Sequence, residues 1–146
     1  MTRAMIVTCL YRLAGEPAFM NDNIFSDVPR GSYYEKAVIW AHGKGIVKGV
    51  SENKFAPNAE VTREQLAAIL FRYANYREYD VSVGENTNIL SYDDAFSVSE
   101  YAYAPLQWAC GAGIIGGIGS NLVPAGNATR AQIAAILHRF CEAYEK

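Results

Sequence analysis

The chain carries the same amphipathic pattern three times. Counted from an arginine that follows a threonine, apolar side chains recur three, six, seven and ten residues later in each copy. This spacing places them on one face of a helix with 3.6 residues per turn. The copies begin at Thr2, Thr62 and Thr129, with offsets of 60 and 67 residues. The pattern therefore predicts amphipathic helices near residues 2–13, 62–74 and 129–144.

The two later copies carry the signature of a capping box at their starts. Thr62 is followed three residues later by Gln65, and Thr129 by Gln132. At this spacing the threonine hydroxyl accepts a hydrogen bond from the third backbone N–H, and the glutamine side chain returns one. In the first copy a methionine takes the glutamine's place, so the return bond is missing there.

A second helical pattern, with one tryptophan in each copy, precedes the second and third Thr-Arg helices. The first of these helices is predicted near residues 33–44, where Ser32 and Glu35 have capping-box spacing. The other is predicted near residues 102–112, where Pro105 indicates a kink or a late start. A glycine-rich turn and an apolar-proline turn follow both helices.

These elements define a repeating unit that ends in a Thr-Arg helix. The chain divides into the last helix of a truncated first repeat (1–14), a repeat (24–75) and a divergent repeat (89–146). Such self-similarity is typical of repeat architectures, so we expect an all-α helical repeat array that forms one compact domain.

The first Thr-Arg helix lacks the preceding half of its own repeat. We expect its apolar stripe to be buried against the other two Thr-Arg helices as the third member of a central bundle. The surface left uncovered by the absent half is expected to favour self-association.

Composition excludes several classes of function. The 146 residues are 51% apolar and carry a net charge of -2, so no basic excess is available for binding nucleic acid. No apolar run approaches the ~20 residues that span a bilayer, so we expect no membrane insertion. The three cysteines show no CxxC spacing and the two histidines no HExxH context, so we expect no metal or cofactor. Catalytic motifs are missing as well, and we interpret the adjacent acids Asp93 and Asp94 as solvated loop residues rather than a glycosidase pair.

Five motifs, in order and at the right spacing, resemble the S-layer homology family. They are Phe25-Ser26-Asp27-Val28, Trp40, Gly45-Ile46-Val47-Lys48-Gly49, Phe55-Ala56-Pro57 and Thr62-Arg63-Glu64-Gln65. The third copy departs from this pattern, because Leu90-Ser91-Tyr92-Asp93-Asp94 replaces the first motif and Leu122 the phenylalanine.

The resemblance implies both a fold and a function. The fold is a pseudo-threefold, all-helical spindle with grooves between neighbouring repeats. The function is noncovalent attachment of an exported protein to a secondary cell-wall polysaccharide, through an anionic, typically pyruvylated sugar. The protein would then be extracellular, at the cell wall or S-layer, with its signal peptide upstream of this chain.

The arginines of the Thr-Arg pairs, Arg3, Arg63 and Arg130, are the first candidates for binding such a ligand. Free backbone N–H groups and the helix dipole favour an anion at the first turn of a helix. A guanidinium there adds a planar fork that fits a carboxylate. The structural alternative is an ion pair with an acid such as Asp27. The recurring Arg12, Arg72 and Arg139 have no helix N-terminus beside them, and we interpret them as solvated or salt-bridged.

The remaining candidates each have a structural alternative. Trp40 and Trp108 would stack on a sugar if exposed and would fill the core if buried. Gly49 and Gly117 permit close approach of a ligand to the backbone, or serve a turn with positive φ. Asp27 orients the arginine, accepts from a sugar hydroxyl, or caps its loop.

Two functions therefore remain open from the sequence. One is a carbohydrate-binding anchor, and the other is a protein-interaction or structural repeat without glycan binding. Arginines that line an open groove would favour the anchor, and arginines that are paired and buried would favour the structural repeat.

Overall fold

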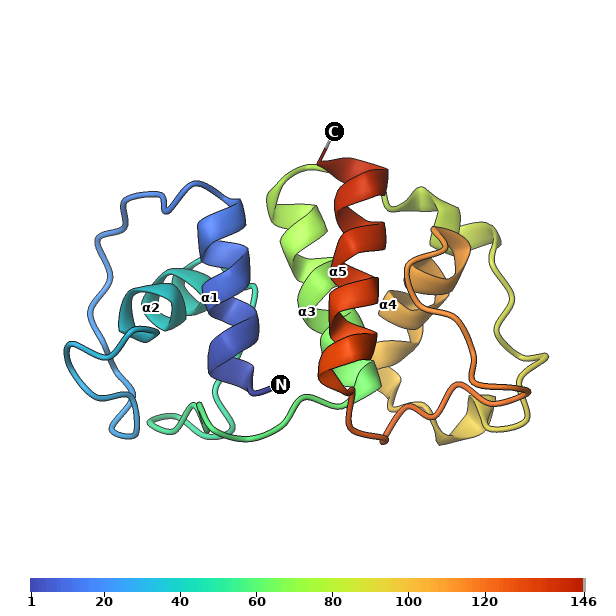
Figure 1. Cartoon of the computed structure of the whole chain (residues 1–146), viewed down its shortest axis with the longest axis horizontal. Coiled ribbons are helices and arrows are strands. Elements are labelled where there is room, and N and C mark those ends of the chain that lie inside the picture. The colour runs from blue at the N-terminus through green and yellow to red at the C-terminus, as the bar shows by residue number, and fades with distance from the viewer. Residues whose placement is uncertain (146) are drawn as a thin grey trace. The chain divides into compact units, whose positions relative to one another are not determined.

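The computed structural model describes residues 1–145 and is built from helices (Figure 1). No β-strand and no helix of the length and apolarity needed to cross a membrane occurs in this described part. The all-α prediction is confirmed, and all five α-helices begin within about two residues of their predicted starts. They are α1 (Arg3–Leu13), α2 (Glu35–Gly43), α3 (Arg63–Tyr76), α4 (Glu100–Gly111) and α5 (Arg130–Tyr144), with the 3-10 helices η1 (Ser82–Asn86) and η2 (Ala95–Ser97) between α3 and α4.

The chain folds as two compact units that do not coincide with the sequence repeats. The first unit is Met1–Glu60 and the second is Val61–Lys146. Each begins with a Thr-Arg helix and continues through the tryptophan helix and turns of the following repeat. The boundary between the two units thus falls inside the repeat 24–75, just ahead of its Thr-Arg helix, and the second unit also contains α5.

In the first unit, α1 packs against α2. The ring of Tyr11 on α1 lies 5.3 Å from the indole of Trp40 on α2, and Ile6 and Leu10 of the apolar stripe are fully buried. A tryptophan helix of the following repeat therefore serves as partner to α1. The self-association expected from the sequence stays a prediction.

In the second unit, α4 packs against both α3 and η1. Phe71 lies 5.6 Å from Trp108, which repeats the Tyr11–Trp40 contact, and Phe140 of α5 lies 6.2 Å from the same indole. A Cβ at Gly84 of η1 would lie 2.9 Å from the backbone of Trp108. The connector before α4 is therefore folded onto that helix, at a distance that only glycine permits.

The helix starts follow the predicted chemistry at the Thr-Arg helices but not at α2. Both capping boxes, at Thr62 and Thr129, are present. The box predicted at Ser32 is wrong, because its hydroxyl donates to the carbonyl of Pro29 (2.7 Å) and α2 begins only at Glu35. The late start predicted at Pro105 is also wrong, since α4 begins five residues earlier.

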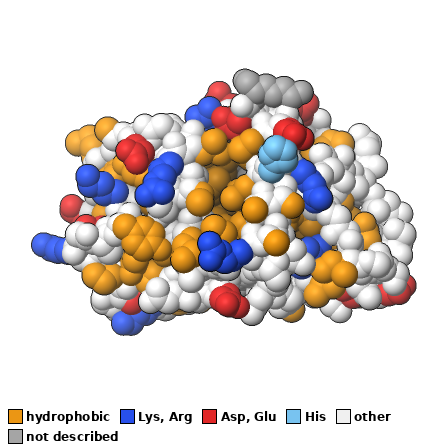
Figure 2. All heavy atoms as spheres, in the orientation of Figure 1, with side chains coloured by type: hydrophobic (Ala, Val, Ile, Leu, Met, Phe, Trp, Pro, Cys, Tyr) orange, Lys and Arg blue, Asp and Glu red, His pale blue; other side chains and the backbone are white. Residues whose placement is uncertain are grey.

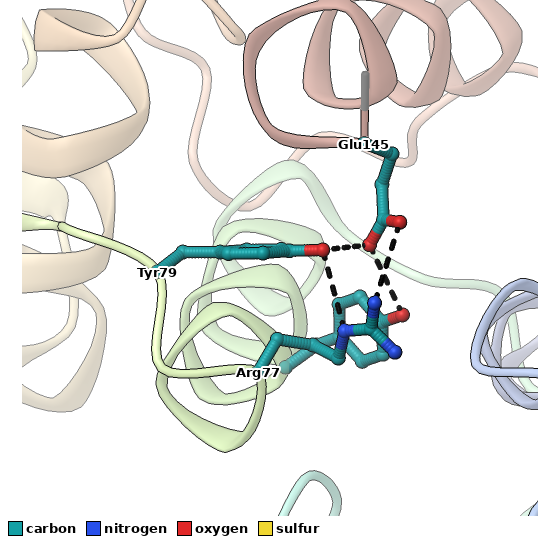
Figure 3. Close-up of polar contacts among 4 residues, drawn as sticks. Arg77, Tyr79 and Glu145 are labelled. Atoms are coloured by element: carbon teal, nitrogen blue, oxygen red, sulfur yellow. Dashed lines mark hydrogen bonds and ion pairs between the residues drawn. The ribbon is translucent and has the colours of Figure 1, made fainter.

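A polar cluster joins the last residues of α5 to the end of α3 in the second unit (Figure 3). The hydroxyl of Tyr79 donates to the carboxylate of Glu145, and that of Tyr73 donates to the same carboxylate at 3.4 Å. Nη2 of Arg77 lies 3.6 Å from the other oxygen of Glu145. The cluster therefore fixes the C-terminal end of α5 against α3.

Candidate functional site

The Thr-Arg arginine of the second unit holds a turn. Arg63 is only 4% exposed, and its Nε donates to the carbonyl of Leu122 at 2.8 Å and its Nη2 to the carbonyl of Gly116 at 2.6 Å. Burial lowers the pKa of this guanidinium from its usual range, and Asp94 is among the groups that oppose the shift. The two carbonyls supply the acceptors that a buried cation needs.

The first unit repeats this arrangement with Arg3. Its Nε donates to the carbonyl of Phe55 at 3.0 Å and its Nη2 to that of Lys48 at 2.7 Å. The guanidinium also lies 4.6 Å from the centre of the Phe55 ring. Arg3 and Arg63 therefore have the same structural role in the two units.

The backbone N–H groups at these helix starts are not free for an anion, contrary to the sequence interpretation. In α3, Arg63 N donates to Gly126 O (2.9 Å) and Glu64 N to Pro124 O (3.0 Å). In α1, the first two N–H groups donate in the same way to Ala59 and Pro57. The first two donors of each helix are thus occupied by backbone of the following repeat, and the third is capped by threonine.

Asp27 caps the turn that Arg3 holds in the first unit. Its two carboxylate oxygens accept from the N–H groups of Phe55 and Ala56, both at 2.8 Å. Desolvation raises the pKa of Asp27, but these backbone hydrogen bonds outweigh it and hold the pKa below its usual value. Of the roles considered for Asp27, the loop cap is the one present here.

The divergent repeat keeps this cap, so the interpretation that its first motif is replaced is wrong. Asp94 accepts from the N–H groups of Leu122 (2.7 Å) and Val123 (2.8 Å), as Asp27 does in the first unit. The aspartates are 67 residues apart, which is also the offset between the second and third Thr-Arg helices. That offset was the signal that could have identified Asp94 from the sequence.

An aromatic ring of the same unit leaves no room for a side chain at Gly49 and at Gly117. A Cβ at Gly49 would lie 2.6 Å from the ring of Phe25, and one at Gly117 would overlap the ring of Tyr92. Neither glycine has positive φ, so the alternative of a turn that requires positive φ does not apply at these positions. The close approach is made by a ring that occupies the same place in both units.

Both tryptophans are core residues. Trp40 and Trp108 are 0% exposed, and Nε1 of Trp108 donates to the hydroxyl of Tyr144 at 3.0 Å. Stacking on a sugar requires an exposed indole face. The structure therefore supports the packing interpretation for both side chains.

The second unit contains a pocket of about 250 Å³ beside the turn that Arg63 holds. It is lined by Arg63, by Gly116, Gly117 and Ile118 of the glycine-rich turn, and by Gln132, Ala135, Ile136 and Arg139 of α5. Of the expected site residues, the pocket brings together Arg63 and Gly117. Arg130 is exposed at the start of α5 and is not among the lining residues.

Ile118 and Arg139 are among the lining residues that were not expected from the sequence. Ile118 is 49% exposed at the tip of the glycine-rich turn, and the exposed Val50 holds the corresponding place in the first unit. Arg139 recurs with Arg12 and Arg72, and that recurrence was the available signal.

Figure 2 shows acidic and basic side chains interspersed on the face that it presents, so an anion there would be bound by individual side chains.

Comparison with known proteins identifies the family. The model of the S-layer homology domain matches residues 24–67 and 91–134. This chain belongs to the S-layer homology domain family. Each match runs from the loop ahead of a tryptophan helix into the first turns of a Thr-Arg helix.

Relatives of this chain include proteins named as enzymes and as surface proteins. The chain is 34% identical over 97% of its length to an amylopullulanase of Thermoanaerobacterium thermosulfurigenes and to exoglucanase XynX of Acetivibrio thermocellus. It is 32% identical over 81% of its length to the surface-layer 125 kDa protein of Lysinibacillus sphaericus. The matches span only 8%, 13% and 10% of these proteins. The enzyme names thus describe much longer proteins, of which the S-layer homology domain is a small part.

Proposed function

We propose that this chain is a noncovalent cell-surface anchor that binds an anionic, pyruvylated secondary cell-wall polysaccharide. Family membership and the similarity to a surface-layer protein support the anchoring role. The anchored protein would lie outside the cell, at the cell wall or S-layer.

The observation that carries the proposal is the pocket of the second unit. Two arginines, Arg63 and Arg139, line it together with the aliphatic side chains of Ile118 and Ile136. A pyruvate ketal carries a carboxylate and a methyl group on the same carbon. Guanidinium groups suit the carboxylate, and the aliphatic wall suits the methyl group. Arg3 and Arg130 occupy the repeat position of Arg63 and belong to the proposed binding residues.

Cosedimentation with purified cell walls tests this function. The chain should pellet with walls that retain the polysaccharide and should stay in solution after the polysaccharide is removed chemically. Walls whose ketals alone have been cleaved by mild acid test the finer proposal. Binding that survives the loss of the whole polysaccharide would refute glycan anchoring. Loss of binding after cleavage of the ketals alone would support the pyruvylated ligand.

A second candidate, a structural or protein-interaction repeat without glycan binding, is favoured by one observation. Arg3 and Arg63 both donate to backbone carbonyls of their own units, which gives each a structural role that needs no ligand. This candidate predicts that cosedimentation with the walls is absent or independent of the polysaccharide.

A further inference from the structure

The two arginines of the pocket differ in how far their donors are already used. Nε and Nη2 of Arg63 make hydrogen bonds of 2.8 and 2.6 Å to carbonyls, and the side chain is buried. Arg139 is exposed and makes one long contact, 3.5 Å from Nη1 to the carbonyl of Ile114. The ion pairs Arg77–Glu145 and His138–Glu142 do not involve Arg139.

The acid nearest to Arg139 along its helix is directed to another partner. The carboxylate of Glu142 lies 2.8 Å from Nε2 of His138, one turn away on α5. A guanidinium has five N–H donors, so Arg139 keeps most of its donors for a ligand. In Arg63, by contrast, Nε and Nη2 already donate to the carbonyls that hold the turn. A ligand could accept from these two atoms only in competition with those carbonyls.

Arg139 also lines a second hollow of about 530 Å³, together with Ala112, Gly113, Glu142 and Ala143. The side chain therefore stands where two hollows of the second unit meet. A polymer that continues past its acidic group could occupy both hollows while the guanidinium pairs with the carboxylate.

We infer that Arg139 is the anion-binding side chain of this pocket, and that Arg63 is a positioning residue that holds the glycine-rich turn lining it. This inference rests on the proposed function, because the anion is the acidic group of the cell-wall polymer. It reverses the order expected from the sequence, in which the arginine at the helix start binds and the arginine nine residues later is solvated or salt-bridged.

Binding of three variants to purified cell walls tests this inference. Arg139→Gln should bind walls about tenfold or more weakly than the wild type, because a charge-assisted contact is lost. Its thermal unfolding should be unchanged, since Arg139 makes only one long contact. Arg139→Lys keeps the charge and should recover part of the affinity. Lys44→Gln removes one exposed charge at the C-cap of α2 and should bind as the wild type does.

A small probe separates the two arginines directly. A methyl hexoside that carries one pyruvate ketal, titrated into the labelled chain, should shift the side-chain N–H resonances of Arg139 more than those of Arg63. Wild-type affinity of Arg139→Gln, together with polysaccharide-dependent binding of the wild type, would overturn the inference and leave the proposed function intact. Loss of polysaccharide dependence in the wild type itself would overturn both.

Discussion

Arg63 donates a hydrogen bond of 2.8 Å to the carbonyl of Leu122, 59 residues further along the chain. Arg3 makes the corresponding bond to Phe55 in the first unit. α1 and α3 are thereby tied to the turn of the following repeat, and this tie explains why the two structural units begin at these helices. Both arginines thus have a role in holding the turn that needs no ligand.

Replacement of Arg63 should affect stability and binding together. Arg63→Ala removes two charge-assisted bonds, one to the carbonyl of the buried Leu122 and one to that of Gly116, each worth ~1.5–3 kcal/mol, so we expect a lower free energy of unfolding in urea. Binding to cell walls should fall as well, because the turn that lines the pocket is no longer held. Arg72→Ala, on the same helix but outside the lining of this pocket, should affect binding less. Wild-type wall binding by a folded Arg63→Ala variant would contradict the role of Arg63 in holding the turn that lines the pocket.

Two adjacent glycines provide a matched test of the aromatic contact in the turn. Gly117→Ala should destabilise the second unit by ~1–3 kcal/mol, because the new methyl group overlaps the ring of Tyr92. Gly116→Ala meets no atom within 4 Å and should unfold at nearly the wild-type temperature. Differential scanning calorimetry of both variants measures the difference. Equal melting temperatures would show that the ring of Tyr92 moves aside without cost.

The carboxylate of Asp27 should make stability depend on acid pH. Because its pKa is lowered in the folded state, its contribution is present above the unfolded value of about 3.9 and is lost as pH falls through the lowered pKa. Asp27→Asn should therefore be less stable than the wild type at pH 6, and the difference should shrink below about pH 4. Urea unfolding at a series of pH values measures this convergence, and a difference that is constant with pH would contradict it.

The buried phenol of Tyr73 should make stability depend on alkaline pH. Burial, together with the neighbouring Glu145 carboxylate, raises the pKa of Tyr73 far above its usual value. The contribution of the neutral phenol is therefore present below the ordinary value of about 10 and is lost as pH rises above it. Tyr73→Phe should flatten the alkaline loss of stability measured by thermal unfolding. An unchanged alkaline profile in this variant would assign the loss to other groups.

The helices and the family could be predicted from the sequence because the signals are local. The apolar period of 3.6 and the boxes at Thr62 and Thr129 act within a few residues, and the structure contains all five expected helices. The same local rule failed at Ser32, where a competing carbonyl in the preceding turn takes the hydroxyl.

Only the tertiary structure decided what the recurring polar residues do. A repeated arginine, aspartate or tryptophan has the same spacing whether it faces a ligand or the core. Its role depends on which distant backbone groups reach it: Arg63 finds the carbonyl of Leu122, and Asp94 finds the N–H groups of the same turn. The pocket at Arg139 likewise exists only because α5 packs beside a turn from earlier in the chain. Spacing along one helix determines which residues share a face, whereas the partners of that face are fixed by chain segments tens of residues away.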